Sequence, residues 1–229
     1  MISIDVIIPT YNSAGLLADA LDSIDAQTLP PRRVLVVDDG STDDAVARST
    51  AGRSNVTVIR RPNGGVSAAR NTGAAASRAD ALLFLDHDDL LTPPALATLA
   101  SAIGSAPGIE MVHGMMREFV DPNSPPPPGV RTTERVLPSR LAGSSLVMRS
   151  LWLRVGELRE GMSQGEWIDW IDRAMALGTS VRTVDAVICE RRIHGRNTTR
   201  GTSGKANYLA VARDALQRKR DGETSGDGR

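Results

Sequence analysis

The alternation of two kinds of segment along the first hundred residues is the feature that most limits the fold of this chain. Short runs rich in β-branched residues predict strands near 3–9, 33–38, 56–60 and 81–86. Alanine-rich stretches between them predict helices near 14–26, 43–51, 66–77 and 93–103. This order predicts an α/β fold with a mainly parallel sheet flanked by helices in a single domain. Ligands of such sheets bind beyond the carboxyl ends of the strands, so we expect the functional residues there.

Three carboxylates follow the fourth predicted strand, in the segment Phe84-Leu85-Asp86-His87-Asp88-Asp89. An unpaired charge is costly to bury, so acids at a strand end usually face solvent, a cation or a ligand. The alternating Asp86 and Asp88 suit a hard divalent cation, and Mg²⁺ prefers one or two carboxylates together with phosphate oxygens. The segment therefore predicts a metal site that binds a diphosphate.

Polar residues also follow the first two predicted strands, in Pro9-Thr10-Tyr11-Asn12 and in Asp38-Asp39-Gly40-Ser41-Thr42-Asp43. Tyr11 could stack on a planar base, or it could pack locally in a turn. The adjacent acids Asp38 and Asp39 could accept hydrogen bonds from a base or a ribose, whereas residues 40–43 fit a turn that caps the next helix. Each segment, taken alone, leaves both interpretations open.

A loop with two glycines, Asn63-Gly64-Gly65, leads from the third predicted strand into the next predicted helix. It matches neither a Walker A sequence nor a dinucleotide fingerprint. Backbone N–H groups at the start of that helix could still assist a phosphate. Arg70 and Asn71, one turn into the helix, could brace a nucleotide or the acids at 86–88.

The composition excludes several classes of protein. Lysine plus arginine equals aspartate plus glutamate at 27 residues each, which argues against a nucleic-acid binder, because such proteins carry a basic excess or stripe. The single cysteine, Cys189, excludes an internal disulfide and a zinc site built from cysteines. No apolar run approaches the roughly 20 residues that a membrane span needs, and the N-terminus lacks the features of a signal peptide. We therefore expect a soluble, cytoplasmic chain.

The second half of the chain is less regular. We expect a strand at 109–120, a helix at 163–177 and one or two strands within 180–193. Four consecutive prolines at 125–128 favour a stiff extended connector over a recognition motif for a partner domain. A last helix near 204–219 and a polar, disordered tail at 220–229 complete the expected organisation.

The segments at 7–12, 36–43, 63–71 and 84–89 together have the order and spacing of motifs in a known family. The chain resembles the family 2 glycosyltransferases of the GT-A fold, closely over residues 1–100 and more loosely to about residue 195. The resemblance implies that residues 1–105 form the half that binds a nucleotide-sugar. It implies that residues 106–203 form the acceptor-binding and catalytic half of the same domain.

The resemblance also implies a role for each matching residue of the first half. Pro9 and Tyr11 would contact the base, with the ring of Tyr11 against it. Asp39, together with Asp38, would read a uracil-like edge. Asp86 would hold the ribose, and the carboxylate two residues later, Asp88, would ligate Mg²⁺ or Mn²⁺ between the two phosphates.

The second half departs from the family pattern at the expected catalytic base. Inverting relatives usually carry a Glu-Asp pair at the start of the acceptor-side helix, and Trp167 stands here where that aspartate would be. A base must lie within hydrogen-bond reach of the acceptor hydroxyl, which leaves Glu166 and Asp169 as candidates. Ser163 and Glu166 have the spacing of a capping box, which would occupy the Glu166 carboxylate, whereas Asp169 lies most of a turn deeper. Helical spacing places Trp167 and Trp170 on a separate stripe, which we expect in the core.

A basic cluster ends the last predicted strand, in Arg191-Arg192-Ile193-His194. The simplest interpretation is a solvated strand end with a neutral histidine. GT-A enzymes, however, often add a C-terminal histidine to the metal or the diphosphate. The resemblance therefore implies that His194 binds metal or phosphate and that Arg191 or Arg192 neutralises the leaving diphosphate, since the planar fork of arginine binds two oxygens.

Together these features predict a metal-dependent, inverting glycosyltransferase that moves a sugar from a nucleotide-diphosphate donor, UDP-linked in this prediction, to an acceptor hydroxyl. One alternative is a non-catalytic module that binds a sugar-nucleotide. Another is a sugar-nucleotide nucleotidylyltransferase, which would show a glycine-rich, basic loop after the first strand. The sequence leaves open the sugar, the acceptor and the oligomeric state, a homo-oligomer included.

Overall fold

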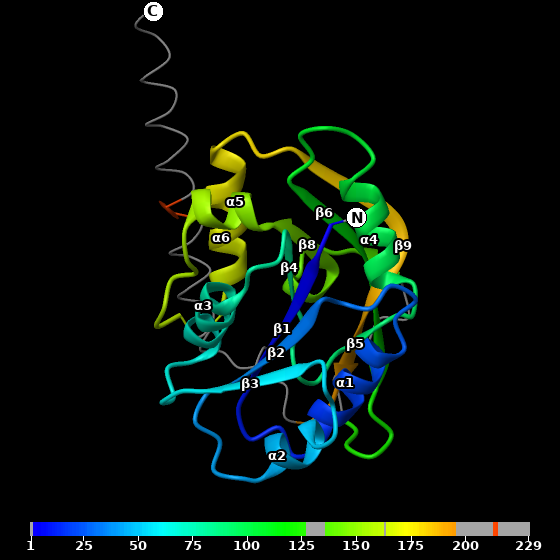
Figure 1. Ribbon diagram of the computed structural model, residues 1–229, viewed down its shortest axis with the longest axis vertical. Helices are drawn as coiled ribbons and strands as arrows, with labels where there is room; N and C mark the ends of the chain where they lie inside the picture. Colours follow the sequence, from blue (N-terminus) through cyan, green and yellow to red (C-terminus); the bar gives the residue numbers. More distant parts are fainter. Residues whose placement is uncertain (1, 127–135, 163, 196–212, 215–229) are drawn as a thin grey trace, which may run out of the picture.

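The predicted alternation of strands and helices builds the first half of a mixed sheet in the computed structural model, which describes residues 2–126, 136–162, 164–195 and 213–214 (Figure 1). The elements of this half are β1 (Ile4–Thr10), α1 (Leu16–Asp25), β2 (Arg33–Asp38), α2 (Ala45–Thr50), β3 (Val56–Arg60), α3 (Val66–Ala76) and β4 (Ala81–Phe84). β2 and β4 both pair with β1 in parallel, and β3 pairs with β2 in parallel. The parallel arrangement predicted for this half is confirmed.

Antiparallel strands enter the sheet in the second half. Its elements are β5 (Leu90–Leu91), α4 (Ala95–Ile103), β6 (Met111–Val120), β7 (Leu137–Pro138), η1 (Ala142–Ser144), β8 (Ser145–Met148), α5 (Arg149–Val155), α6 (Glu166–Ala176) and β9 (Val181–Ile193). β8 lies antiparallel between β4 and β6, while β9 runs parallel to β6. Within the described residues the order is β3-β2-β1-β4-β8-β6-β9-β5, with β7 on β6. The predicted α/β fold is confirmed, and the whole sheet is mixed because β5, β7 and β8 add antiparallel pairs.

The core lies on both faces of this sheet because successive side chains of a strand point to opposite faces. In β1, Val6 and Ile8 pack with α1 and α4, whereas Ile7 packs with α3, α5 and α6. The second face contains a stack of aromatic rings, with the centroid of Trp170 lying 5.2 Å from that of Trp152 and 5.3 Å from that of Trp167. The prediction that the tryptophan stripe of the acceptor-side helix is core is confirmed.

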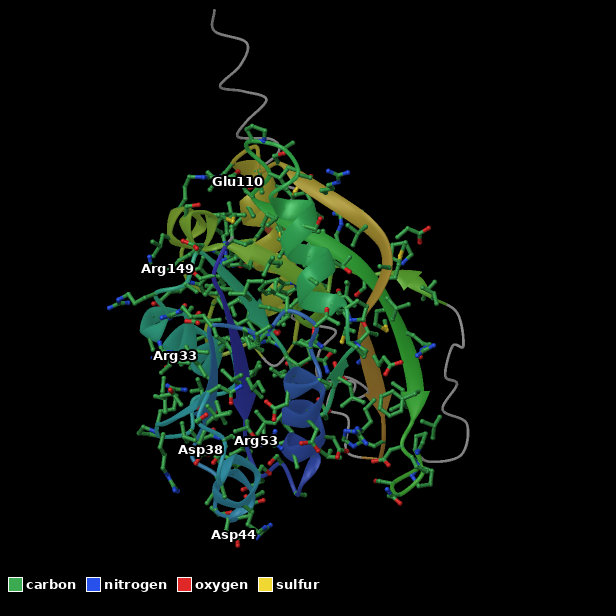
Figure 2. All side chains as sticks on the ribbon, turned by 45° about the vertical axis from the view of Figure 1, so that its right-hand side comes forward. Arg33, Asp38, Asp44, Arg53, Glu110 and Arg149 are labelled. Atoms are coloured by element: carbon green, nitrogen blue, oxygen red, sulfur yellow. The ribbon has the colours of Figure 1, made fainter. Side chains whose placement is uncertain are left out.

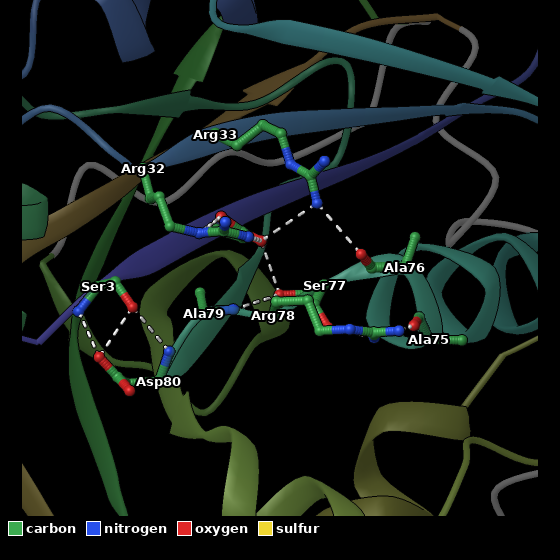
Figure 3. A network of polar contacts seen from close by, with 10 residues as sticks. Ser3, Arg32, Arg33, Ala75, Ala76, Ser77, Arg78, Ala79 and Asp80 are labelled. Atoms are coloured by element: carbon green, nitrogen blue, oxygen red, sulfur yellow. Dashed lines mark hydrogen bonds and ion pairs between the residues drawn. The ribbon is translucent and has the colours of Figure 1, made fainter.

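A buried charge network joins β1, β2 and α3 at the end of the sheet where β1 begins (Figure 3). Asp5 is fully buried, and its carboxylate accepts hydrogen bonds from Arg32 Nε at 3.0 Å, Arg32 Nη2 at 2.6 Å and Ser77 Oγ at 2.7 Å. Arg33 Nη2 lies 3.9 Å from the same carboxylate. A buried carboxylate needs such partners, and this network orders the end of the sheet opposite the predicted site.

Several expectations fall on residues outside the described ranges. The expected helix at 204–219 is described only at residues 213 and 214, where the backbone is helical, and the tail at 220–229 is not described. The proline tract is described only as far as residue 126. Among the helices of the described chain, none has both the length and the apolar character that crossing a bilayer requires.

The network around Asp5 gives a stability prediction. We expect Asp5→Ala to lower the free energy of unfolding by about 1–3 kcal/mol, because the Ser77 hydroxyl and the Arg32 guanidinium lose their acceptor. Asp80→Ala is the matched control, since the exposed Asp80 carboxylate accepts its hydrogen bonds from the hydroxyl and N–H of Ser3 near the start of the chain, and we expect a change of about 0.5 kcal/mol or less. Urea titration measures both values. Equal effects of the two substitutions would contradict the role assigned to Asp5.

Candidate active site

The polar segments predicted from the sequence gather at the carboxyl ends of the parallel strands. Asp38 ends β2 beside Thr10, the last residue of β1. Figure 2 shows Asp38 toward the end of the molecule opposite Glu110, which precedes β6. The acid segment (residues 86–89) follows β4, and the end of β9 reaches it although about a hundred residues separate the two in sequence. The candidate site is therefore built from both halves of the chain.

The acid segment brings three carboxylates together. One oxygen from each of Asp86, Asp88 and Asp89 lies within 4.8 Å of the others. Burial raises the pKa of Asp89 well above its usual value, and the negative charges of Asp88 and Asp86 raise it further. Burial also acts to raise the pKa of Asp86, but the charge and hydrogen bond of Arg70 outweigh it and lower that pKa.

These residues fit a divalent cation. Carboxylate oxygens are the ligands that Mg²⁺ and Mn²⁺ favour, and a cation would relieve the repulsion that raises the pKa of Asp89. His194 Nε2 lies 3.0 Å from Asp88 Oδ2 and adds an imidazole nitrogen at the same point. The structure thus places the two predicted metal ligands, Asp88 and His194, in direct contact.

Arg70 connects the acid segment with the acceptor-side helix. Its buried guanidinium donates from Nη2 to Asp86 Oδ1 at 2.6 Å and from Nη1 to Glu166 Oε1 at 2.7 Å. Burial acts to lower the pKa of Arg70, yet the two carboxylates raise it above its usual value. Arg70 therefore stays charged and joins Asp86 of the first half to Glu166 of the second.

The two candidate bases lie in different surroundings. α6 begins at Glu166 after Gly165, which has a left-handed backbone and serves as N-cap. The predicted capping box places Glu166 at the third helical position, but Glu166 is the first residue of α6 and its carboxylate contacts Arg70; Ser163, its expected partner, lies outside the described residues. Asp169 is fully buried, and its Oδ2 accepts a hydrogen bond from Arg173 Nε at 2.9 Å. Trp167 is buried, and its indole N–H donates to the carbonyl oxygen of residue 140 at 2.8 Å.

The residues expected at the base of the nucleotide show mixed exposure. The Tyr11 side chain is 48% exposed, whereas Pro9, Asp38 and Asp39 are buried. Asp38 Oδ1 accepts the N–H of Ser41 at 2.8 Å. The loop after β3 surrounds the carboxylate of Asp39, which accepts hydrogen bonds from Arg61 Nη1, Gly64 N and Gly65 N. These bonds fix both acids at the mouth of the sheet.

The two arginines of β9 differ in their contacts. The Arg191 side chain is 25% exposed and lies 3.8 Å from Glu118. Its positive charge reaches Asp86 and Asp89, where it opposes the rise that burial causes in their pKa values. The Arg192 side chain is only 6% exposed and donates from Nη2 to Asp19 Oδ2 at 2.7 Å.

Two acids of this region were not predicted from the sequence, namely Asp19 on α1 and Asp121 just after β6. Both lie near the guanidinium of Arg192, at 2.7 and 3.7 Å. The position of Asp121 directly after a predicted strand was a signal that could have drawn attention to it. Asp19 gave no such signal, since an acid in the first turn of a helix is ordinarily explained by its interaction with the helix dipole.

Comparison with known proteins places the chain among glycosyltransferases. Residues 5–140 match the family model described as glycosyl transferase family 2. Over 178 residues the chain is 30% identical to an uncharacterized glycosyltransferase of Haemophilus influenzae, an alignment that covers 73% of the chain and 60% of that relative. The chain thus spans less than two thirds of this relative's length.

Solved structures show the same fold. The first 349 residues of Staphylococcus aureus TarS, in complex with UDP-GlcNAc, align with a TM-score of 0.74 at 20% identity, over 94% of this chain and 66% of that one. The mannosyltransferase PcManGT from Pyrobaculum calidifontis, in complex with GDP-Man and Mn²⁺, aligns with a TM-score of 0.66 at 21% identity, over 86% and 59%. The likeness confirms the predicted GT-A fold.

The buried Asp89 gives a prediction for the pH dependence of stability in the presence of a chelator. Because folding raises its pKa above the ordinary 3.8, its contribution to stability is present below that value and is lost as the pH rises through the raised pKa. Asn at this position carries no charge and can still accept the N–H of Arg192. We therefore expect Asp89→Asn to be more stable than the wild type at about pH 8, with a difference that shrinks toward about pH 4. Urea titrations across this range measure it, and a constant difference would contradict the assignment.

Proposed function

The chain belongs to glycosyl transferase family 2, and on that basis we propose that it transfers a sugar from a nucleotide-diphosphate donor to an acceptor hydroxyl, with inversion at the anomeric carbon. We propose a UDP-linked donor and dependence on a divalent cation. Family membership favours this activity over nucleotidyl transfer. The structural relatives solved with UDP-GlcNAc and with GDP-Man and Mn²⁺ support a nucleotide-sugar donor.

The observation that carries the proposal is the contact of His194 with Asp88 inside the acid segment, at 3.0 Å. Asp88 and His194 would hold Mg²⁺ or Mn²⁺, with Asp86 and Asp89 close by. Such a cation, when bound, supplies positive charge that neutralises the diphosphate as it leaves. Arg191 adds a second positive charge on the same side, and its planar fork suits phosphate oxygens.

The other end of the donor would lie over the ends of β1 and β2. Tyr11 is exposed and is available to stack on the base, and the buried Pro9 lies two residues before it, near the end of β1. Asp38 and Asp39 are held in fixed orientations by backbone N–H groups. Acceptors that are fixed before binding lose little freedom when a ligand arrives, which supports their proposed role in reading a uracil-like edge.

Among the two candidate bases we favour Glu166. Asp169 is fully buried and bound to Arg173, so an acceptor hydroxyl has no access to it. The Glu166 side chain is 12% exposed, and Arg70 places it beside Asp86. Glu166 would take the proton of the acceptor hydroxyl as its oxygen attacks the anomeric carbon. The bond from that carbon to the diphosphate breaks on the opposite side, and the nucleoside diphosphate leaves with the electron pair.

Substitution of each candidate base tests this choice. We expect Glu166→Gln to lower kcat by about 10²–10⁴-fold while donor binding persists, because glutamine keeps the contact with Arg70 but cannot accept the proton. Asp169→Asn is the matched control. It should lower the free energy of unfolding and leave kcat close to that of the wild type. Release of nucleoside diphosphate in the presence of acceptor measures turnover. If Glu166→Gln stays active, Glu166 is not the catalytic base. If Glu166→Gln and Asp169→Asn both stay active, the proposal that either carboxylate is the base is wrong.

Donor binding tests the metal ligands separately from turnover. With Mn²⁺ present, a donor at about 100 times its Kd should raise the free energy of unfolding by about 2.7 kcal/mol. Among nucleotide-sugars we expect the UDP-linked ones to stabilise the wild type most, and a chelator to abolish the effect. His194→Ala should lose the Mn²⁺-dependent part of this stabilisation, while His87→Ala, within the acid segment itself, should keep it. Thermal shifts compare the donors, the chelator and the two variants. If His194→Ala behaves like the wild type, the proposed role of His194 is contradicted.

A further inference from the structure

We propose that Arg192 is a positioning residue, which fixes the acid segment for its cation, and that it does not bind the diphosphate. The inference rests on the proposed function only in assigning the cation to this segment. It separates the roles of two adjacent arginines that the sequence could not distinguish. Arg191 is left as the arginine that faces the diphosphate, and Arg192 acts through Asp88 and Asp89.

Hydrogen bonds from Arg192 and His194 join the end of β9 to the acid segment. The backbone N–H of Arg192 donates to Asp89 Oδ1 at 3.0 Å, and Arg192 Nε donates to the carbonyl oxygen of Asp88 at 3.0 Å. Two residues further along, His194 Nε2 lies 3.0 Å from Asp88 Oδ2. The backbone and the side chain of Asp88 are therefore held from the same strand end, and Arg192 contributes both a backbone and a side-chain bond to the acid segment.

The terminal nitrogens of the Arg192 guanidinium have partners on other elements of the described chain. Nη2 donates to Asp19 Oδ2 on α1 at 2.7 Å, and Nη1 lies 3.7 Å from Asp121 Oδ2. The guanidinium carbon lies 5.1 Å from the centroid of the Phe119 ring, a cation–π distance. With a side chain only 6% exposed and these partners on three sides, Arg192 is anchored to α1 and β6.

This anchoring has a consequence for the metal ligands. Groups that orient a ligand without touching the metal usually control metal affinity by about 10–100-fold. Arg192 fixes the carbonyl of Asp88 and thereby the direction of its carboxylate toward His194. Lysine keeps the positive charge but has neither Nε–H nor a planar fork, so Arg192→Lys changes the geometry while the charge of the site stays the same.

The test measures Mn²⁺ affinity by calorimetry and by electron paramagnetic resonance, with no nucleotide present. We expect Arg192→Lys to weaken Mn²⁺ binding by about 10–100-fold. Arg117→Lys is the matched control, because Arg117 also lies near the end of a strand of this sheet but is 52% exposed and pairs with Glu190, and its Mn²⁺ affinity should equal that of the wild type. Asp19→Ala removes only the distant acceptor of Arg192 Nη2, on an exposed helix face, and we expect a smaller loss of Mn²⁺ affinity in the same direction.

The outcomes separate this inference from the proposed function. If Arg192→Lys keeps the Mn²⁺ affinity of the wild type but binds UDP more weakly in the presence of a chelator, Arg192 binds the phosphates directly, and the inference is overturned. Failure of the wild-type chain to bind Mn²⁺ would contradict the proposed metal dependence. In that case the rate of backbone amide hydrogen exchange at residues 86–89 tests whether Arg192 positions the acid segment. Faster exchange in Arg192→Lys, but not in Arg117→Lys, supports it, and unchanged exchange overturns it.

Discussion

The contact between the end of β9 and the acid segment after β4 is the interaction on which the rest of the site depends. Carboxylates at a strand end are costly to hold together, because burial removes their hydration and their negative charges repel one another, and both effects raise the pKa of Asp89. The contacts from Arg192 and His194 hold these acids in place despite the repulsion. Because the two segments lie about a hundred residues apart in sequence, the site forms only when both halves of the sheet have folded together.

Arg70 provides the second connection between the halves, and it follows the same physical rule. A buried charge is tolerated when its partners surround it, and removal of one partner leaves an uncompensated charge. The Arg70 guanidinium lies between Asp86 and Glu166, so the residue proposed for the ribose and the residue proposed as base share one counter-ion. This arrangement gives Glu166 a fixed orientation although Trp167 stands where the family resemblance implies an aspartate.

The sequence predicted those parts of the molecule that follow from local rules. Alternating strands and helices imply a parallel half-sheet, and acids placed after its strands therefore meet at one edge, which is why Asp86, Asp88 and Asp38 could be placed there. The insertion of β8 between β4 and β6 was not predictable, because a short strand pairs according to its tertiary neighbours. The capping box misplaced Glu166 within the helix for a related reason: a left-handed Gly165 begins the helix later than the Ser163–Glu166 spacing suggests. The partners of Arg192 lie on three separate elements, and no local pattern connects them.

The most direct test of this account is a crystal structure of the chain with UDP and Mn²⁺, in which anomalous scattering locates the metal. We expect a Mn²⁺ peak at the Asp88 carboxylate and His194 Nε2, with the diphosphate on the side of Arg191. A metal bound elsewhere, or a bound diphosphate with Asp88 and His194 turned away from it, would contradict the central claim.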